Sequence, residues 1–394
     1  MSWGDGMLTS MIKSAELFAG GGGLALGTEL AGAKHVALAE WNRWACDTLR
    51  SNQNAGYPLL RGVQIFEGDV RDISWGEVAK GVDLLVGGPP CQPFSSGGLS
   101  RAADDPRDMF PAMTDAIQQV QPRAFIVENV KGLTRKSFSE YYSYIKLRLT
   151  YPALRAREGE TWVEHLGRLR NTDMHSKSVG LAYRLVDTVV NAADYGIPQH
   201  RHRVFLIGFR SDVTDGWAFP APTHSGAALK ELQLTGEYFE RHKVPRADRR
   251  VVARAGGSRD LLPWVTVRDA LCDMPVPELE GVSGWLDHEL KLGARVYKGH
   301  TGSPIDEPSK ALKAGAHGVP GGENMVRFPD GSVRYFSVRE AARIQTFPDD
   351  YALHGAWGEV MRQIGNAVPV QLAQIVGRSV VEHLEKDSDD TLLL

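Results

Sequence analysis

The chain has 394 residues, enough for two or three domains at roughly 150 residues per domain. Hydrophobic residues make up 42% and charged residues 24%, which excludes a disordered, collagen-like or coiled-coil protein. The net charge of -3 excludes a globally basic surface for nucleic acid, but it permits a local basic cleft. No apolar run approaches the ~18 residues that a membrane span needs. The first residues, MSWGDGMLTSMIKSAELF, lack the basic and apolar regions of a secretory signal, so we expect a cytoplasmic protein.

Short apolar runs alternate with longer helical patterns over the first half of the chain, which is typical of βαβ units. Seven strands are expected, at 15–18, 35–39, 64–66, 82–86, 124–127, 185–190 and 203–207. Such runs are apolar on both sides and need cover on both faces. We therefore expect an α/β fold, with an open and mostly parallel seven-stranded sheet between two layers of helices.

The pattern changes in the second half of the chain. After a polar helical stretch at 131–178, residues 211–329 are rich in glycine, proline and charge and have little regular periodicity. Helical spacing returns near residue 338, and the acidic stretch 382–390 is expected to fray. The expected parts are a first domain at 1–210, a second and smaller domain at 211–330, and a segment at 331–394 that returns to the first domain.

The cysteines are few and far apart: Cys46, Cys91 and Cys272. An odd number without CxxC spacing excludes a disulfide framework and a cysteine-rich zinc site, and we expect no metal. The pattern leaves room for a lone reactive thiol.

A glycine-rich stretch, Phe18-Ala19-Gly20-Gly21-Gly22-Gly23, follows the first expected strand and precedes a helical pattern. Such glycines let the backbone approach a ligand closely, and the helix that follows offers free N–H groups. Glu40 ends the second strand, where an acid can accept hydrogen bonds from ribose hydroxyls, and Trp41 beside it can stack. Asp69 follows the third strand. These residues predict a nucleoside pocket, which fits a dinucleotide oxidoreductase and an S-adenosylmethionine enzyme equally well.

Cys91 lies in the stretch Gly87-Gly88-Pro89-Pro90-Cys91-Gln92-Pro93-Phe94-Ser95, directly after the fourth expected strand. The carboxyl ends of strands are where open α/β sheets bind their ligands. An isolated cysteine is often a small buried hydrophobic residue. Three prolines and two glycines around it pack poorly in a core, so we favour a nucleophile.

This stretch resembles the Pro-Cys-Gln motif of the cytosine carbon-5 DNA methyltransferases, and five further stretches resemble motifs of that family in the same order. They are the glycine stretch, Glu128-Asn129-Val130, Gln199-His200-Arg201-His202-Arg203, Arg339-Glu340-Ala341-Ala342-Arg343-Ile344-Gln345-Thr346-Phe347-Pro348 and Gln363-Ile364-Gly365-Asn366-Ala367-Val368-Pro369. The departures are small. Glu16 stands where an aspartate is commoner, Ala367 stands where a serine is common, and the stretch 131–178 is longer than in compact members.

The resemblance implies the Rossmann-like fold of S-adenosylmethionine-dependent methyltransferases, with a target-recognition domain at 211–330. It implies a DNA (cytosine-5-)-methyltransferase of the restriction-modification type, with S-adenosyl-L-methionine as cofactor and double-stranded DNA as substrate. The implied catalytic residues are Cys91, Glu128, Arg201 and Arg203. The implied cofactor-binding residues are Phe18, Gly20, Gly21, Gly22, Gly23, Glu40, Trp41, Asp69, Val70, Pro90, Asn366 and Ala367.

The chemistry of these residue types agrees with that reaction. Carbon 5 of cytosine is a poor nucleophile, and addition of the Cys91 thiolate to carbon 6 pushes electrons into the ring. Glu128, at the end of an apolar strand, can share a proton with the ring near N3. Arg201 and Arg203 are expected on one face of a strand entry, where they would hold the base carbonyl and a phosphate oxygen. The cytosine must first be flipped out of the duplex.

The DNA contacts are expected in two places. Residues 241–259 contain seven Lys or Arg and one acid, which suits phosphate binding, and Arg249 and Arg250 represent this run. Gln92, Ser95 and Arg107 follow the proposed nucleophile and are also expected to contact DNA.

Other functions remain open at this point. An RNA (tRNA) cytosine-5 methyltransferase of the same fold is the main alternative, and the length of the 211–329 segment favours DNA. A nicotinamide oxidoreductase has no use for Cys91 or for the Glu-Asn-Val stretch, and a DNA-binding regulator has no need of the intact Cys91, Glu128 and Arg203. We expect a protein that acts as a monomer away from membranes. A cognate restriction endonuclease would act in the same system without direct binding.

Overall fold

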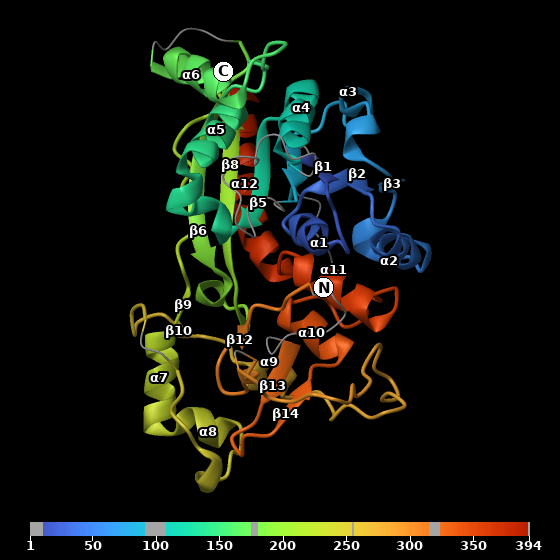
Figure 1. The fold of residues 1–394 in the computed structure, drawn as a ribbon, viewed down its shortest axis with the longest axis vertical. Helices are drawn as coiled ribbons and strands as arrows, with labels where there is room; N and C mark the ends of the chain where they lie inside the picture. Colours follow the sequence, from blue (N-terminus) through green and yellow to red (C-terminus); the bar gives the residue numbers. More distant parts are fainter. Residues whose placement is uncertain are drawn as a thin grey trace.

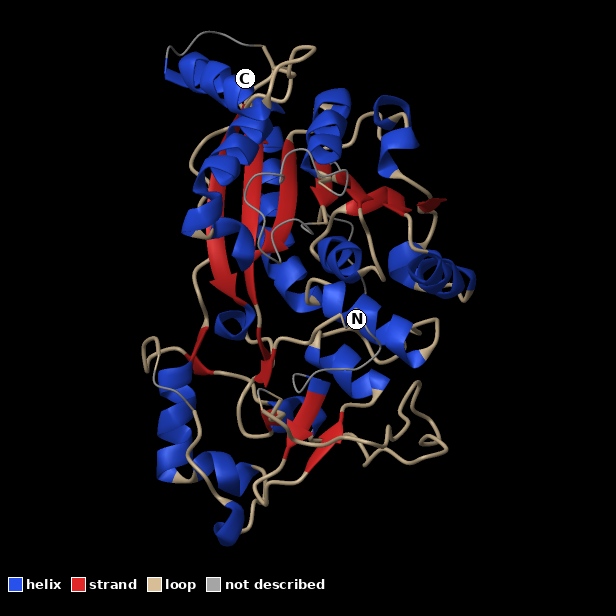
Figure 2. Ribbon diagram, viewed as in Figure 1, coloured by secondary structure: helices blue, strands red, loops and turns tan. Residues whose placement is uncertain are grey.

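The computed structural model describes residues 11–90, 108–174, 180–253, 256–298, 300–314 and 324–392. Its central feature is a seven-stranded sheet with the strand order β3-β2-β1-β4-β5-β8-β6 (Figures 1 and 2). The strands are β1 (Lys13–Leu17), β2 (Lys34–Glu40), β3 (Gln64–Glu67), β4 (Leu84–Gly87), β5 (Ala124–Val130), β6 (Tyr183–Asn191) and β8 (His202–Arg210). All seven expected strands are present, and the predicted fold class is confirmed.

The first five of these strands run parallel, and β8 runs antiparallel to both of its neighbours, β5 and β6. The carboxyl ends of β1, β2, β4 and β5 therefore meet at one edge of the sheet, which we call the carboxyl edge. Leu17, Gly87 and Val127 lie side by side there in the pairing register. The glycine stretch, Glu40, the segment before Cys91 and Glu128 all reach this edge.

The sheet is covered on both faces because its central strands alternate between two apolar surfaces. Leu85 of β4 packs in one core with Phe125 of β5, whereas Leu84 and Val86 pack in the other. One face carries α3 (Trp75–Val78), α4 (Phe110–Val120) and α5 (Ser139–Thr150), with α6 (Trp162–Met174) against α5. The other face carries α1 (Gly23–Leu30), α2 (Arg43–Asn54) and α12 (Val370–Leu392) (Figure 1).

The expected helical stretch at 131–178 contributes directly to this cover. Tyr141, Tyr142, Ile145 and Leu149 of α5 are buried in the core beneath it. The aromatic side chains explain why a stretch that looks polar in the sequence still forms an inner layer.

The region below the sheet in Figure 1 is built from short elements. The helices are α7 (Gly226–Thr235), α8 (Glu237–Arg241) and α9 (Val267–Leu271). The strands are β7 (Gln199–His200), β9 (His224–Ser225), β10 (Leu262–Pro263), β11 (Ser303–Pro304), β12 (Ser309–Lys310), β13 (Met325–Arg327) and β14 (Val333–Tyr335). Helices α7 and α8 have a small core of their own, formed by Leu229, Tyr238, Phe239, Val244 and Ala253.

Two pairings join residues 211–330 to the parts of the chain on either side of them. Strand β12 pairs in parallel with β7, and β13 pairs antiparallel with β14. The boundary expected at residue 330 lies in the turn between β13 and β14, and Val326 and Phe336 share a core with α10 (Val338–Ile344) and α11 (Trp357–Asn366). The division of the chain into a catalytic and a reading domain stays a prediction.

The C-terminal segment returns to the sheet. Helix α12 packs against α1 and extends through the acidic stretch 382–390, so the expected fraying there was wrong. The reason is that Asp387 accepts hydrogen bonds from the backbone N–H and the hydroxyl of Thr214, both at 2.6 Å, and pairs with Arg123 at 2.8 Å. Among the described residues, no helix is long and apolar enough to cross a membrane.

Candidate active site

The glycine loop, residues 18–23, connects β1 to α1 at the carboxyl edge. Phe18, Gly20 and Gly22 have left-handed backbone conformations, with φ of 62°, 55° and 93°. A Cβ on Gly22 would lie 2.9 Å from the Tyr351 hydroxyl, and one on Gly23 would lie 2.5 Å from the carbonyl oxygen of Val368. Glycine is therefore required here both for the turn and for the close approach of the C-terminal segment. No described side chain caps the start of α1, so its first N–H groups can face a ligand.

Glu40 fixes the shape of this loop from the neighbouring strand. Its carboxylate accepts backbone N–H groups of Gly20 at 2.8 Å, Trp41 at 3.0 Å and Asn42 at 2.7 Å. Burial raises the pKa of Glu40, and these N–H donors and the charge on Arg362 oppose the rise. Oε2 receives only one of the three bonds, so it retains an acceptor site for a ligand hydroxyl. The Trp41 ring beside it is 76% exposed and offers a free aromatic face.

Glu16 is a second acid beneath the glycine loop. It lies on β1, is 1% exposed, and its Oε2 has no hydrogen-bond partner among the described residues. Burial, and then the nearby charge of Glu40, raise the pKa of Glu16 well above its usual value. Burial therefore favours the neutral form of this carboxyl group.

Asp69 and Val70 follow β3 at the same edge. The Asp69 carboxylate accepts the Arg71 backbone N–H at 2.9 Å and pairs with its guanidinium group, which lowers the pKa of Asp69. The Val70 side chain is buried in the core, and its carbonyl accepts the Trp75 indole N–H at 2.9 Å. Within the described residues the backbone N–H of Val70 donates no backbone hydrogen bond, so it can face a ligand.

Glu128 lies near the end of β5 and is 7% exposed. Its Oε1 forms an ion pair with Arg203 Nε at 2.7 Å, across the antiparallel pair of β5 and β8. Burial raises the pKa of Glu128, and the charges of Arg203 and Arg201 oppose the rise. A Cβ on Gly88 would lie 3.5 Å from Glu128 Oε2, so the carboxyl group touches the segment that leads to Cys91.

Arg201 was expected on one face of a strand entry beside Arg203, and the charges of both arginines act on Glu128. Arg201 lies between β7 and β8, is 0% exposed, and donates to the carbonyl oxygens of Leu312 at 3.2 Å and Gly365 at 2.8 Å. Its Nε has no partner among the described residues. The two carbonyls draw the side chain inward, so Arg201 ties three distant segments together.

Asn129 holds the segment before Cys91, a role that the sequence did not reveal. Its amide donates to the carbonyl oxygen of Pro89 at 2.9 Å. At the other side of the site, Gln363 accepts the Thr48 hydroxyl at 2.8 Å and would lie 3.1 Å from a Cβ on Gly21. Ala367 contacts the same loop, since its Cβ would lie 3.0 Å from a Cβ on Gly23.

The remaining predicted site residues divide into three groups. Cys91, Gln92, Ser95 and Arg107 lie outside the described residues. Pro90 lies at the carboxyl edge after β4, and Asn366 is exposed at the end of α11. Arg249 and Arg250 lie on the region of α7 and α8, away from the carboxyl edge.

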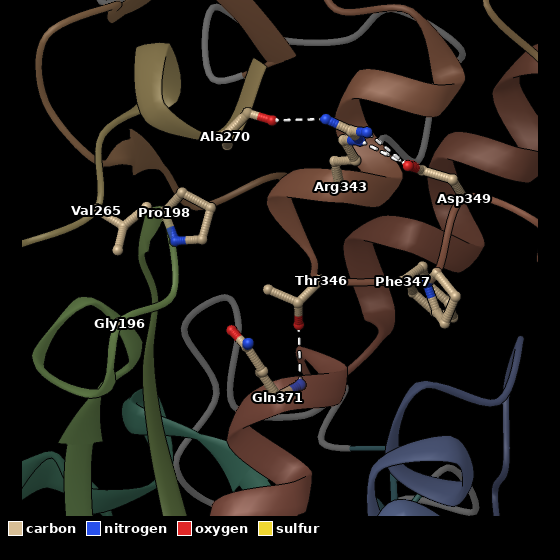
Figure 3. Close-up of a pocket in the computed structure, with 10 residues that line it drawn as sticks. Gly196, Pro198, Val265, Ala270, Arg343, Thr346, Phe347, Asp349 and Gln371 are labelled. Atoms are coloured by element: carbon tan, nitrogen blue, oxygen red, sulfur yellow. Dashed lines mark hydrogen bonds and ion pairs between the residues drawn. The ribbon is translucent and has the colours of Figure 1, made fainter. Parts of the chain in front are cut away.

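A cavity in the described part of the chain lies elsewhere. It has a volume of about 380 Å³ and is lined by Gly196, Pro198, Val265, Ala270, Arg343, Thr346, Phe347, Pro348, Asp349 and Gln371 (Figure 3). In it, Arg343 is already bound to Asp349 and to the carbonyl of Ala270. None of these residues is a predicted site residue. We place the active site at the carboxyl edge because the buried acids and the glycine loop converge there.

The family model of the C-5 cytosine-specific DNA methylases matches residues 12–150, 169–251 and 287–382. The chain belongs to this family, whose methyl donor is S-adenosyl-L-methionine and whose substrate is DNA. It is 31% identical to the type II methyltransferase M.PspPI of Psychrobacter sp., over 99% of this chain and 84% of that protein. It is 30% identical to the type II methyltransferase M.NgoMIV of Neisseria gonorrhoeae, over 95% of this chain and 99% of that protein.

Among solved structures, the fold resembles the Dnmt2 methyltransferase of S. pombe, with a TM-score of 0.54 and 18% identity over 95% of this chain and 98% of that one. These comparisons confirm the predicted family, enzyme class and cofactor. They favour the DNA enzyme over the RNA alternative, because the matching family model and the curated relatives are those of DNA methylases.

Proposed function

We propose that this methylase is the modification enzyme of a type II restriction-modification system, and that it works through a covalent adduct of Cys91 with a flipped cytosine. The observation that carries this proposal is the arrangement at the end of β5. Glu128 is buried against Arg203, and Asn129 next to it binds Pro89, two residues before Cys91. The acid that can share a proton, Glu128, and the chain segment that leads to the thiol nucleophile therefore meet at one point of the carboxyl edge. The names of the relatives support the type II assignment.

The residues around the glycine loop fit the cofactor. The left-handed turns at Gly20 and Gly22 leave backbone, and no side chain, facing the ligand, and Glu40 and Trp41 offer an acceptor and an aromatic face. The residues that would hold it are Phe18, Gly20, Gly21, Gly22, Gly23, Glu40, Trp41, Asp69, Val70, Pro90, Asn366 and Ala367. When bound, S-adenosyl-L-methionine supplies an electrophilic methyl group. The protein residues hold it, exclude water and aim it at carbon 5.

The reaction begins with the Cys91 thiolate, which forms a bond to carbon 6 of the flipped base. Electrons move toward N3 of the ring, where the protonated Glu128 donates a hydrogen bond or its proton. Burial raises the pKa of Glu128, which favours the protonated form that this role needs. Arg203, whose Nε lies 2.7 Å from Oε1 of Glu128, fixes the orientation of the carboxyl group. After methyl transfer the carbon-5 proton passes to solvent, its electron pair re-forms the double bond between carbons 5 and 6, and the Cys91 thiolate leaves carbon 6.

We assign Arg201 a positioning role. Its guanidinium group is occupied by two carbonyls, so it orders the segments near Leu312 and Gly365 around the site. The region 211–330 is assigned to target recognition. We also propose that the enzyme is cytoplasmic, acts as a monomer, and shares its target sequence with a cognate endonuclease that it does not bind.

The test is bisulfite sequencing of plasmid DNA from cells that express the chain. We expect one cytosine in a short duplex site to be protected from conversion, and we expect Cys91→Ser to abolish the protection while leaving cofactor and DNA binding intact. Duplex DNA with 5-fluorocytosine at that site should form an adduct with the wild-type protein that survives denaturation, since fluorine replaces the carbon-5 proton and cannot be eliminated in its place. Methylation by the serine variant, or the absence of an adduct with active enzyme, would refute the assignment of the nucleophile.

A further inference from the structure

Three exposed cations follow Glu128 within eight residues of the chain. Lys131, Arg135 and Lys136 lie in two short 3-10 turns and the junction between them, η4 (Lys131–Thr134) and η5 (Lys136–Phe138), which connect β5 to α5 (Figure 1). None of the three forms an ion pair with any residue in the described part of the chain. No acid lies between residues 131 and 138. We call these three residues the β5 exit cluster.

The segment that carries the cluster is firmly held. Leu133 is 0% exposed and Phe138 is 6% exposed, and both belong to the core beneath α5. The backbone N–H groups of Arg135 and Phe138 donate to the carbonyls of Gly132 and Arg135. The two buried anchors leave the cationic side chains pointing to solvent, so their charges are presented from a fixed backbone.

The cluster is close to the proposed reaction point. Lys131 is three residues after Glu128, and three residues of chain span at most about 10 Å. Across the sheet, the charge of Lys131 also reaches the exposed His202, whose pKa is lowered by burial and then by this charge. A base that is flipped out turns about its own backbone, so the phosphates of its strand stay near the mouth of the pocket. Free cations at this distance match those phosphates.

The run at 241–259 fits phosphates less well than its composition indicates. Arg241 pairs with Asp269 at 2.8 Å, and Arg249 donates to the carbonyl of Val244 at 3.1 Å and lies over the ring of Phe239. These arginines stabilise the small core of α7 and α8. Arg250 is exposed, but it donates to backbone carbonyls of its own turn.

We propose that Lys131, Arg135 and Lys136 bind backbone phosphates of the target DNA beside the flipped cytosine. This inference rests on the proposed function and adds a contact surface to it. The surface positions the strand and carries no sequence information, since phosphate contacts fix register and base contacts specify.

The experiment compares two variants with the same change in net charge. The first is Lys131→Gln/Arg135→Gln/Lys136→Gln. The matched control is Lys13→Gln/Arg61→Gln/Lys80→Gln, in which three exposed cations are neutralised near the amino ends of β1, β3 and β4, at the opposite edge of the sheet. The control residues also form no ion pair within the described residues. Binding of a plasmid-derived duplex that carries the methylated site is measured by fluorescence anisotropy over a series of salt concentrations.

We expect the slope of log affinity against log salt to fall by about 0.9 for each phosphate that no longer has a cation beside it, or about 2.7 for the cluster variant. The control variant should keep the wild-type slope. The ratio of affinities for matched and mismatched duplexes should be unchanged, and KM for DNA should rise at constant kcat. The charge-preserving variant Lys131→Arg/Arg135→Lys/Lys136→Arg should also keep the wild-type slope.

A cluster variant with the wild-type slope, or one no different from the control, would overturn the inference. The inference would also be overturned if the salt slope of the cluster variant differed from that of the wild type for RNA but not for duplex DNA. Methylation by the wild-type preparation is measured in parallel. If the wild-type protein methylates DNA but the cluster variant has the same salt slope as the wild type, the proposed function stands and only this inference fails. If the wild-type protein does not methylate DNA, both the proposed function and this inference fail.

Discussion

Glu16→Gln tests whether a neutral acid lies beneath the cofactor loop. Glu16 is 1% exposed and its raised pKa means that the folded chain binds one proton more tightly than the unfolded chain. Above the usual pKa of 4.5, the unfolded chain releases this proton while the folded chain keeps it. The stability that Glu16 contributes is therefore fully present below pH 4.5 and is lost as the pH rises toward the folded-state pKa. Glutamine has nearly the same shape and no proton to lose.

The free energy of unfolding of Glu16→Gln, minus that of the wild type, should therefore increase with pH. One proton gives a slope of about 1.4 kcal/mol per pH unit until the folded-state pKa is reached. Urea unfolding of both proteins without cofactor, followed by tryptophan fluorescence from about pH 4 to pH 8 in unit steps, measures this slope. A constant offset between the two curves reports only the changed hydrogen bonding.

The control has the opposite sign. Glu164 accepts the backbone N–H and hydroxyl of Thr161, and these two bonds, the backbone one most of all, lower the pKa of Glu164. Its stabilising effect is present above the unfolded pKa and is lost as the pH falls, so Glu164→Gln should become less stable than the wild type as the pH rises. Parallel curves for Glu16→Gln and the wild type across the whole range would refute a neutral, buried Glu16.

Three further predictions test other contacts. Tyr351→Phe removes the hydroxyl that donates at 3.0 Å to a glycine-loop carbonyl, so calorimetric titration should show about fivefold weaker cofactor binding, equivalent to ~1 kcal/mol, without loss of fold. A Cβ on Gly27 would lie 2.4 Å from α12, so Gly27→Ala should lower the unfolding free energy by about 1–3 kcal/mol in thermal or urea melts. As the control, Gly167→Ala places its methyl group in open space and should raise the unfolding free energy by up to ~1 kcal/mol. Arg203→Met removes a charge that lowers the pKa of Glu128, so the alkaline limb of the pH profile of kcat should move to higher pH. The value of kcat should also fall about 100-fold, because the Glu128 carboxyl group loses the contact that orients it.

The sheet and the position of the site could be predicted because they depend on local signals. Alternating and continuous apolar runs identified all seven strands, and parallel strands bring their carboxyl ends to one edge. Glu40 was found in this way, from its place at the end of β2. A further local signal was available: Ser337 and Glu340 form a capping box at the start of α10, and the spacing S-x-x-E is visible in the sequence.

The contacts that the sequence did not reveal join residues that are far apart in the chain. Arg201 was expected to hold a base carbonyl or a phosphate oxygen, but its guanidinium group donates to two carbonyls more than 100 residues away in the chain. Tyr351 reaches Gly21 across 330 residues, and nothing in its local pattern indicates this. Arg249 was predicted from local charge density, which does not show that a neighbouring Phe239 ring lies under it.

These distant contacts explain why the C-terminal segment is needed for a site whose acids all lie in the first 210 residues. Tyr351 packs against Gly22 and Val368 against Gly23, so the left-handed turn at Gly22 forms against a surface from the C-terminal part of the chain. The carbonyl of Gly365, in the same stretch, binds Arg201, which also holds Leu312. One short segment at the end of α11 therefore touches the cofactor loop directly and, through a single arginine, the region assigned to DNA recognition.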